Sequence, residues 1–144
     1  MLGGFVLLLS ALGSYLGIPK TFDMQNNKSQ PNVIVHLSFQ FALKVLKYVE
    51  VLEVERKYVI GRQLLKSGTS IGANVREAQN AESRLDFIHK MKVAAKEADE
   101  TEYWLELCQC SEGYADCAGL IADCVSISKV LSKIIASSKL ANII

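Results

Sequence analysis

The sequence predicts an all-α protein, an antiparallel up-and-down bundle of four helices. Three observations lead to this prediction. Apolar residues recur at steps of three and four over most of residues 32–139, the spacing of one face of a helix. Half of the 144 residues are hydrophobic and 22% are charged, as in a single globular domain with its own core. Short connections join the second, third and fourth helical segments, which makes these helices antiparallel neighbours.

We divide the chain into an apolar leader, residues 1–23, and the bundle, residues 24–144. Residues 5–18 are apolar except for two serines and two glycines, a run too short to span a membrane comfortably. The positive residues and the cleavage site of a signal peptide are missing. Met24 opens a polar stretch that precedes the first helix, so we favour a misplaced start codon over a signal peptide. A leader that docks on the bundle is the remaining alternative.

The first helix is expected at about residues 32–54, after Pro31, which suits a helix entry. Phe39, Leu43 and Leu46 widen its apolar face. The junction with the next helix, residues 53–57, contains neither Gly nor Pro. The expected inward stripe is Ile34, Leu37, Phe41, Val45, Tyr48 and Leu52.

The second helix, at about residues 57–80, is the one against which the others are arranged. It carries interior glycines, each of which costs about 1 kcal/mol relative to alanine, so neighbouring helices must hold it in place. Gly68, Gly72 and Ala73 offer bare backbone, and we expect another helix to approach closely there. The expected inward stripe is Ile60, Leu64, Ser67, Ile71, Val75 and Ala78.

The third helix is expected at about residues 84–112, with Ser83 and Asp86 as a capping box and Gly113 as its stop. The fourth follows at about residues 115–139. Four cysteines lie in this part of the chain, at a spacing that matches no zinc pattern. We expect buried free thiols that act as small hydrophobic side chains, which suits a reducing cytosol. The cysteines are Cys108, Cys110, Cys117 and Cys124.

Charge is distributed unevenly along the chain, although the net charge is only +1. Residues 56–76 contain five basic residues and no acid, whereas residues 97–123 contain eight acids and no base. These helices either neutralise each other side by side, or their faces meet between subunits, or the basic face binds nucleic acid. The candidate nucleic-acid-binding residues are Arg56, Lys57, Arg62 and Lys66. The candidate oligomer interface comprises Arg62, Lys66 and Trp104.

Polar residues on the second and third helices form one further candidate cluster. Ser70 and Asn74 are one turn apart, and we expect them to hydrogen-bond across to the third helix and fix its register. Glu102 is expected to pair with a cation of the second helix, because a charge near the apolar stripe needs a partner. The full expected network is Ser70, Asn74, Glu77, Glu100 and Glu102.

No catalytic or cofactor-binding pattern emerges from these residues. A di-metal bundle would need Glu-x-x-His pairs, and neither His36 nor His89 follows a glutamate at that spacing. There is no nucleophile elbow or phosphate-binding loop. The sequence therefore predicts a protein that is not an enzyme and that uses no metal or cofactor.

Two segments, SGTSIGANVREAQ and DFIHKMKVAAKEADETEYWLEL, give the chain its family resemblance. Over residues 33–139 it resembles bacterial four-helix-bundle proteins encoded in intervening sequences of 23S ribosomal RNA genes. The resemblance implies rings, typically pentamers, with a largely unassigned role. A strongly basic relative, the accessory protein of diversity-generating retroelements, contacts nucleic acid and a reverse transcriptase. The most specific positions are Gln63, Leu64, Ser70, Ile71, Asn74, Glu77, Phe87, Ala94, Glu100, Glu102 and Leu105.

From these observations we expect a cytoplasmic, non-catalytic scaffold or interaction module that forms a homo-oligomer, a pentamer in particular. The alternative is an accessory protein that binds structured RNA or DNA through the basic second helix. The expected partner is a second copy of the chain, with nucleic acid or an enzyme that acts on it as further candidates. No membrane partner is expected.

Overall fold

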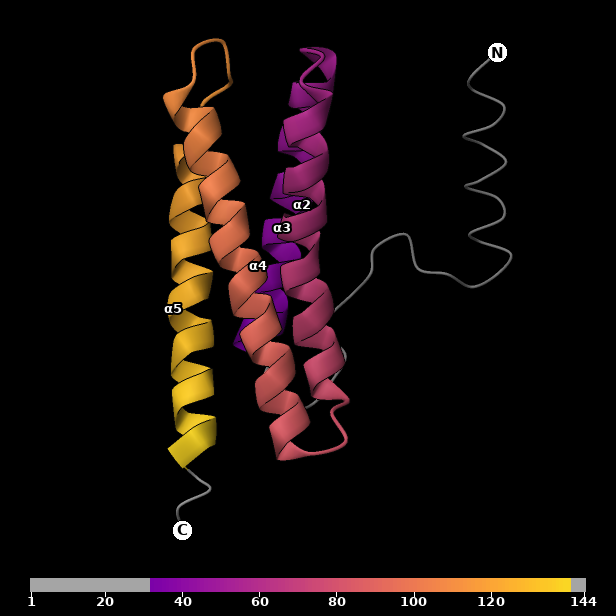
Figure 1. Cartoon of the computed structure of the whole chain (residues 1–144), viewed down its shortest axis with the longest axis vertical. Coiled ribbons are helices and arrows are strands. Elements are labelled where there is room, and N and C mark those ends of the chain that lie inside the picture. The colour runs from indigo at the N-terminus through magenta and orange to yellow at the C-terminus, as the bar shows by residue number, and fades with distance from the viewer. Residues whose placement is uncertain (1–31, 141–144) are drawn as a thin grey trace, which may run out of the picture. The chain divides into compact units, whose positions relative to one another are not determined.

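The structure is a computed structural model that describes residues 32–140, and it contains four helices there (Figure 1). The predictions for residues 1–23 lie outside this range. None of the four helices is long and apolar enough to cross a membrane. Their bounds are α2 Val33–Val54, α3 Tyr58–Gln79, α4 Arg84–Cys110 and α5 Ala118–Leu140.

The four helices pack in the order in which they occur along the chain. α3 lies between α2 and α4, α4 packs against α5, and α5 closes the bundle against α2. The α2–α3 and α4–α5 connections lie at one end of the bundle, and the α3–α4 connection lies at the other (Figure 1). The prediction of an antiparallel up-and-down four-helix bundle is confirmed.

The core follows the predicted stripes closely. Leu37 and Ile60 are only partly buried, whereas the other residues of the two stripes named above are buried. Burial of three polar side chains costs little free energy of folding, because each donates its hydroxyl hydrogen to a carbonyl of its own helix. They are Ser38, Ser67 and Thr101, which donate to Val35, Gln63 and Glu97 respectively.

The α2–α3 junction turns without Gly or Pro because Arg56 adopts the left-handed conformation, with φ at 60°. The backbone N–H of Arg56 donates to Glu53 O at 2.9 Å, and that of Lys57 donates to Leu52 O at 2.8 Å. This hydrogen-bond pair is the Schellman motif, in which glycine normally occupies the left-handed position. An arginine there strains the backbone.

The glycines of α3 differ in how closely they are packed. A Cβ atom built on Gly68 would lie 2.9 Å from Val45 Cγ1, closer than real Cβ contacts allow. A Cβ on Gly72 would lie 3.5 Å from Ser38 O, which is ordinary contact. Close approach is therefore confirmed at Gly68 and is less tight at Gly72, whereas Ala73 is exposed in the subunit.

The ends of α4 are set by side chains. Ser83 Oγ accepts from the backbone N–H of Asp86 at 3.1 Å, as the capping box predicts. The helix ends at Cys110 rather than at residue 112, and α5 begins at Ala118 rather than at residue 115. Gln109 holds the intervening loop, since it accepts from the Cys117 N–H and donates to the Asp116 carboxylate. These side-chain contacts cannot be read from helical periodicity.

The α4–α5 loop is also tied to the α2–α3 end of the bundle. The Tyr48 hydroxyl donates to Ala115 O at 2.8 Å. The Lys57 ammonium lies 3.8 Å from the centre of the Tyr114 ring and 2.9 Å from a Glu55 carboxylate oxygen. Tyr48 of α2 and Lys57 of the α2–α3 junction therefore fix the loop at this end.

Candidate functional site

α2 presents a second apolar face that its own bundle does not cover. Val35, Phe39 and Ala42 are only partly buried, and the Leu43 and Leu46 side chains remain 40% and 42% exposed. The sequence predicted a wide apolar face here, and the structure places its wider part outside the core. A helix that is apolar around most of its circumference is normally covered on most sides.

A groove runs between this face of α2 and the outer side of α3. Its volume is about 300 Å³. The α3 side consists mainly of small residues, so backbone lies close to the surface. At its edge the guanidinium carbon of Arg76 lies 5.4 Å from the centre of the Phe39 ring, a cation–π contact. The groove is lined by Val35, Ser38, Phe39, Ala42, Thr69, Gly72, Ala73 and Arg76.

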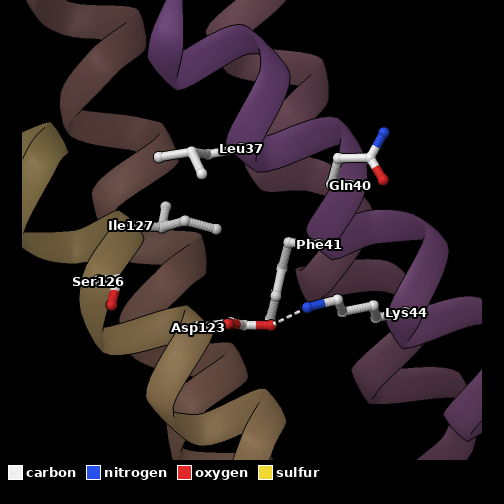
Figure 2. Close-up of a pocket in the computed structure, with 7 residues that line it drawn as sticks. All are labelled: Leu37, Gln40, Phe41, Lys44, Asp123, Ser126 and Ile127. Atoms are coloured by element: carbon white, nitrogen blue, oxygen red, sulfur yellow. Dashed lines mark hydrogen bonds and ion pairs between the residues drawn. The ribbon is translucent and has the colours of Figure 1, made fainter.

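A second, smaller hollow lies between α2 and α5 (Figure 2). Its volume is about 90 Å³. Lys44 and Asp123 form an ion pair of 2.6 Å across its rim, drawn as the dashed line in Figure 2. Pockets for drug-sized ligands usually have volumes of about 300–1,000 Å³, so this hollow is too small to take one.

α4 carries an exposed aromatic ridge near its C-terminal end. The Tyr103 and Leu107 side chains are 54% and 38% exposed, while Trp104 is half-buried against the core. The Tyr103 and Trp104 rings meet edge to face, with centroids 5.1 Å apart. The Trp104 indole N–H donates to Glu100 Oε1 at 3.2 Å, which fixes the indole ring.

The four basic residues proposed for nucleic acid do not share one surface role. Lys57 is held within the subunit by Glu55 and the Tyr114 ring. Arg56, Arg62 and Lys66 are exposed, and none forms an ion pair with residues 32–140.

Charges of α3 and α4 meet within the subunit at two positions. Burial raises the pKa of the Glu97 carboxyl, Glu100 raises it further, and Lys66 opposes the shift. Lys66 therefore lies close to this acid of α4. Glu77 of α3 pairs with Lys90 of α4 at 2.7 Å. The Glu77–Lys90 pair joins an acid of α3 to a base of α4, the reverse of the pairing that the charge runs suggest. Only the interaction of Lys66 with Glu97 supports the first alternative, in which the basic run of α3 and the acidic run of α4 neutralise each other within the subunit.

The expected hydrogen bonds of Ser70 and Asn74 across to α4 are wrong. Ser70 Oγ donates to Lys66 O at 2.7 Å, and the Asn74 side-chain amide donates to Ser70 O at 2.9 Å. Both bonds stay within α3, because carbonyls one turn back are the nearest acceptors for short polar side chains.

The expected pairing of Glu102 with a cation of α3 is also wrong. Burial and the charge of Glu102 raise the pKa of the Cys124 thiol of α5, and Glu102 forms no ion pair with residues 32–140. Glu100, the other α4 acid of the expected network, accepts from Trp104 instead.

Three of the four thiols are buried as predicted, and Cys110 is exposed. Burial raises the pKa of Cys124 to about 12 and raises the pKa values of Cys108 and Cys117. The Cys117 thiol donates to Leu105 O at 3.2 Å. High pKa values keep these buried thiols protonated and unreactive. Within residues 32–140, no three His, Cys, Asp or Glu side chains form a group that could hold a metal ion.

Sequence reasoning missed the groove itself. The sequence reasoning did not assign Arg76, Val35, Ala42 or Thr69 to any surface groove. The available signal was α2, whose apolar residues lie on more than one face.

Comparisons with known proteins agree with this fold. A family model for 23S rRNA-intervening sequence protein matches residues 30–133. The chain is 44% identical to a crystal structure of a protein of unknown function from the S23 ribosomal protein family of Bacteroides thetaiotaomicron. That alignment covers 71% of this chain and 97% of the other, with a TM-score of 0.68. No curated protein matches the chain.

Proposed function

The chain belongs to the 23S rRNA-intervening sequence protein family, and we propose that it is a non-catalytic subunit of a homo-oligomeric scaffold or interaction module. The observation that carries the proposal is the uncovered apolar face of α2. Exposed apolar patches of this kind on a soluble domain mark interaction sites. The buried thiols fit a reducing compartment, and we place the protein in the cytoplasm.

We propose a cyclic assembly, and a pentamer in particular. The resemblance to ring-forming bundles supports this, as does the distribution of charge. The outer side of α3 carries Arg62 and Lys66, whereas the exposed ridge of α4 carries Trp104 among acids. An interface between unlike surfaces is heterologous, and heterologous contacts close into rings where the rotation permits.

Light scattering tests the assembly directly. At micromolar concentration in moderate salt we expect five times the subunit mass of 15.9 kDa. Reversal of both Arg62 and Lys66 to Glu should weaken the contacts, whereas the same reversal at the exposed Lys129 and Lys133 of α5 serves as the matched control. A monomeric mass for the unmodified chain would contradict the proposal.

The non-catalytic part of the proposal is supported by the chemistry of the described residues. The larger hollow is lined by apolar and small side chains with a single charged group, Arg76. The buried thiols have raised pKa values, the opposite of an activated nucleophile.

A second candidate function is association with structured RNA or DNA. The observation that favours it is that Arg56, Arg62 and Lys66 are exposed cations without an ion-pair partner among residues 32–140. Phosphate contacts release counterions, so such binding would weaken steeply as salt rises. Filter binding of a structured RNA at low and moderate salt tests this candidate, and absence of binding at low salt would remove it.

A further inference from the structure

We propose that the groove between α2 and α3 receives the aromatic ridge of α4 from a second copy of the chain, with Arg76 of one copy paired to Glu100 of the next. The inference rests on the proposed assembly and adds to it the two contacting surfaces and their central ion pair.

The groove has the shape and chemistry for a helical ridge. Its α3 side is built from Thr69, Gly72 and Ala73, whose short side chains leave room for large side chains from outside. Its α2 side offers the Phe39 ring and, beyond the groove, the exposed Leu43. An amphipathic helix that lays large apolar residues into such a groove is a common recognition mode.

The ridge supplies the complementary large side chains on a rigid support. Tyr103 and Leu107 are one turn apart and exposed, and Trp104 lies beside them. The edge-to-face contact with Trp104 and the hydrogen bond to Glu100 hold the aromatic pair before any partner arrives. Aromatic anchors that lose little freedom on binding are typical of interface hot spots.

Charge decides which surface fits the groove. Arg76 is exposed at the groove edge and has no ion-pair partner among residues 32–140. Glu100 stands one turn before Trp104, and one of its oxygens accepts the indole N–H, which leaves the other oxygen for a guanidinium. The groove therefore offers a cation beside apolar surface, and the ridge offers an anion beside apolar surface.

The two surfaces lie on different helices of the subunit. The groove is lined by residues of α2 and α3, and the exposed ridge residues belong to α4. Each copy would use its groove toward one neighbour and its ridge toward the other. This is the arrangement that a heterologous ring requires.

Charge exchange tests the pairing. Arg76→Glu and Glu100→Lys, each alone, place like charges together, and each should raise the dissociation constant of assembly by at least about tenfold, equivalent to ~1.4 kcal/mol. The double variant restores an opposite-charge pair and should return the constant to within about threefold of the unmodified chain. Lys129→Glu and Glu112→Lys are the matched controls, because both side chains are exposed, Lys129 belongs to α5 and Glu112 follows the end of α4. Sedimentation velocity gives the constants, and circular dichroism checks helicity.

Trp104 gives a second readout that needs no variant, because it is the only tryptophan in the chain. Its emission should shift to longer wavelength on dilution, in step with dissociation, as the ridge becomes exposed to water. An assembly whose single variants behave as the controls do, whose double variant is not restored, or whose Trp104 emission ignores dissociation would overturn the pairing while the proposed assembly stands. A chain that stays monomeric would overturn both.

Discussion

Replacement of Gly68 by alanine tests the packing of α2 on α3 most directly. A Cβ atom at this position would lie 2.9 and 3.0 Å from the two γ-methyl carbons of Val45. Val45 is buried and β-branched, so it has no free rotamer into which to move. The new methyl group must therefore push the two helices apart or strain one of them.

The change in the free energy of unfolding caused by Gly68→Ala follows from two opposing effects. Alanine gains about 1 kcal/mol of helix propensity over glycine. Overpacking of a core typically costs ~1–3 kcal/mol. Gly68→Ala should therefore be neutral to destabilising by about 2 kcal/mol. Gly61→Ala is the matched control, because its Cβ atom would lie at an ordinary 3.6 Å from Val49 Cγ1. It should stabilise by up to about 1 kcal/mol.

Equilibrium unfolding in urea, followed by circular dichroism, measures both variants. Protein concentration is held equal, since assembly makes apparent stability depend on it. Val45→Ala is then introduced both into the unmodified chain and into the Gly68→Ala variant. The free energy of unfolding that Val45→Ala removes should be smaller in the Gly68→Ala variant by ~1–3 kcal/mol, because loss of the Val45 γ-methyl groups relieves the overlap. A Gly68→Ala variant as stable as Gly61→Ala, with no coupling to Val45, would refute the reasoning.

Three further predictions concern other parts of the bundle. Arg56→Gly should stabilise the chain by about 1 kcal/mol in thermal or urea unfolding, because glycine adopts the left-handed conformation without strain; a loss of stability would contradict the Schellman account. Native chain treated with iodoacetamide at mildly alkaline pH should be labelled at Cys110 alone by mass spectrometry, because the other thiols are buried and have raised pKa values. Burial raises the pKa of Glu97 in the folded state, so its ionisation destabilises the fold, and Glu97→Gln should raise the unfolding midpoint at neutral pH. The rise in the unfolding midpoint should vanish below pH 4.5, the ordinary carboxyl pKa, because Glu97 is then protonated in both the folded and the unfolded chain. A rise of the same size at all pH values would show that the ionisation of Glu97 is not its cause.

The number, order and inward faces of the helices could be predicted because they depend on periodicity alone. Residues such as Leu64, Ile71 and Leu105 fall on apolar stripes with only one direction to face. The helix ends were harder to predict. At the α2–α3 junction a strained Arg56 occupies the position where a Schellman motif usually has glycine. After α4, the contacts of Gln109 with the loop decide where the helix stops.

Polar contacts between helices were predicted poorly, for a physical reason. Helical spacing gives the direction of a side chain only within a broad sector, and short side chains such as Ser70 and Asn74 find acceptors in their own helix first. Glu102 is partly buried, and it forms no ion pair with a cation of α3. A residue at the edge of an apolar stripe can face either neighbouring helix, depending on the angle at which the helices cross. The apolar pattern of one helix does not give that angle.

The two glycines at the α2–α3 contact differ in whether packing within the subunit requires them. Packing within the subunit requires glycine at position 68, because any larger residue would overlap Val45. Packing within the subunit does not require glycine at position 72, because a Cβ atom there would make ordinary contact with Ser38. A glycine that costs helix propensity and that the subunit itself can do without lies in the wall of the groove. Bare backbone at that position is of use to a side chain that enters from outside, as the Tyr103 ridge of a second copy would.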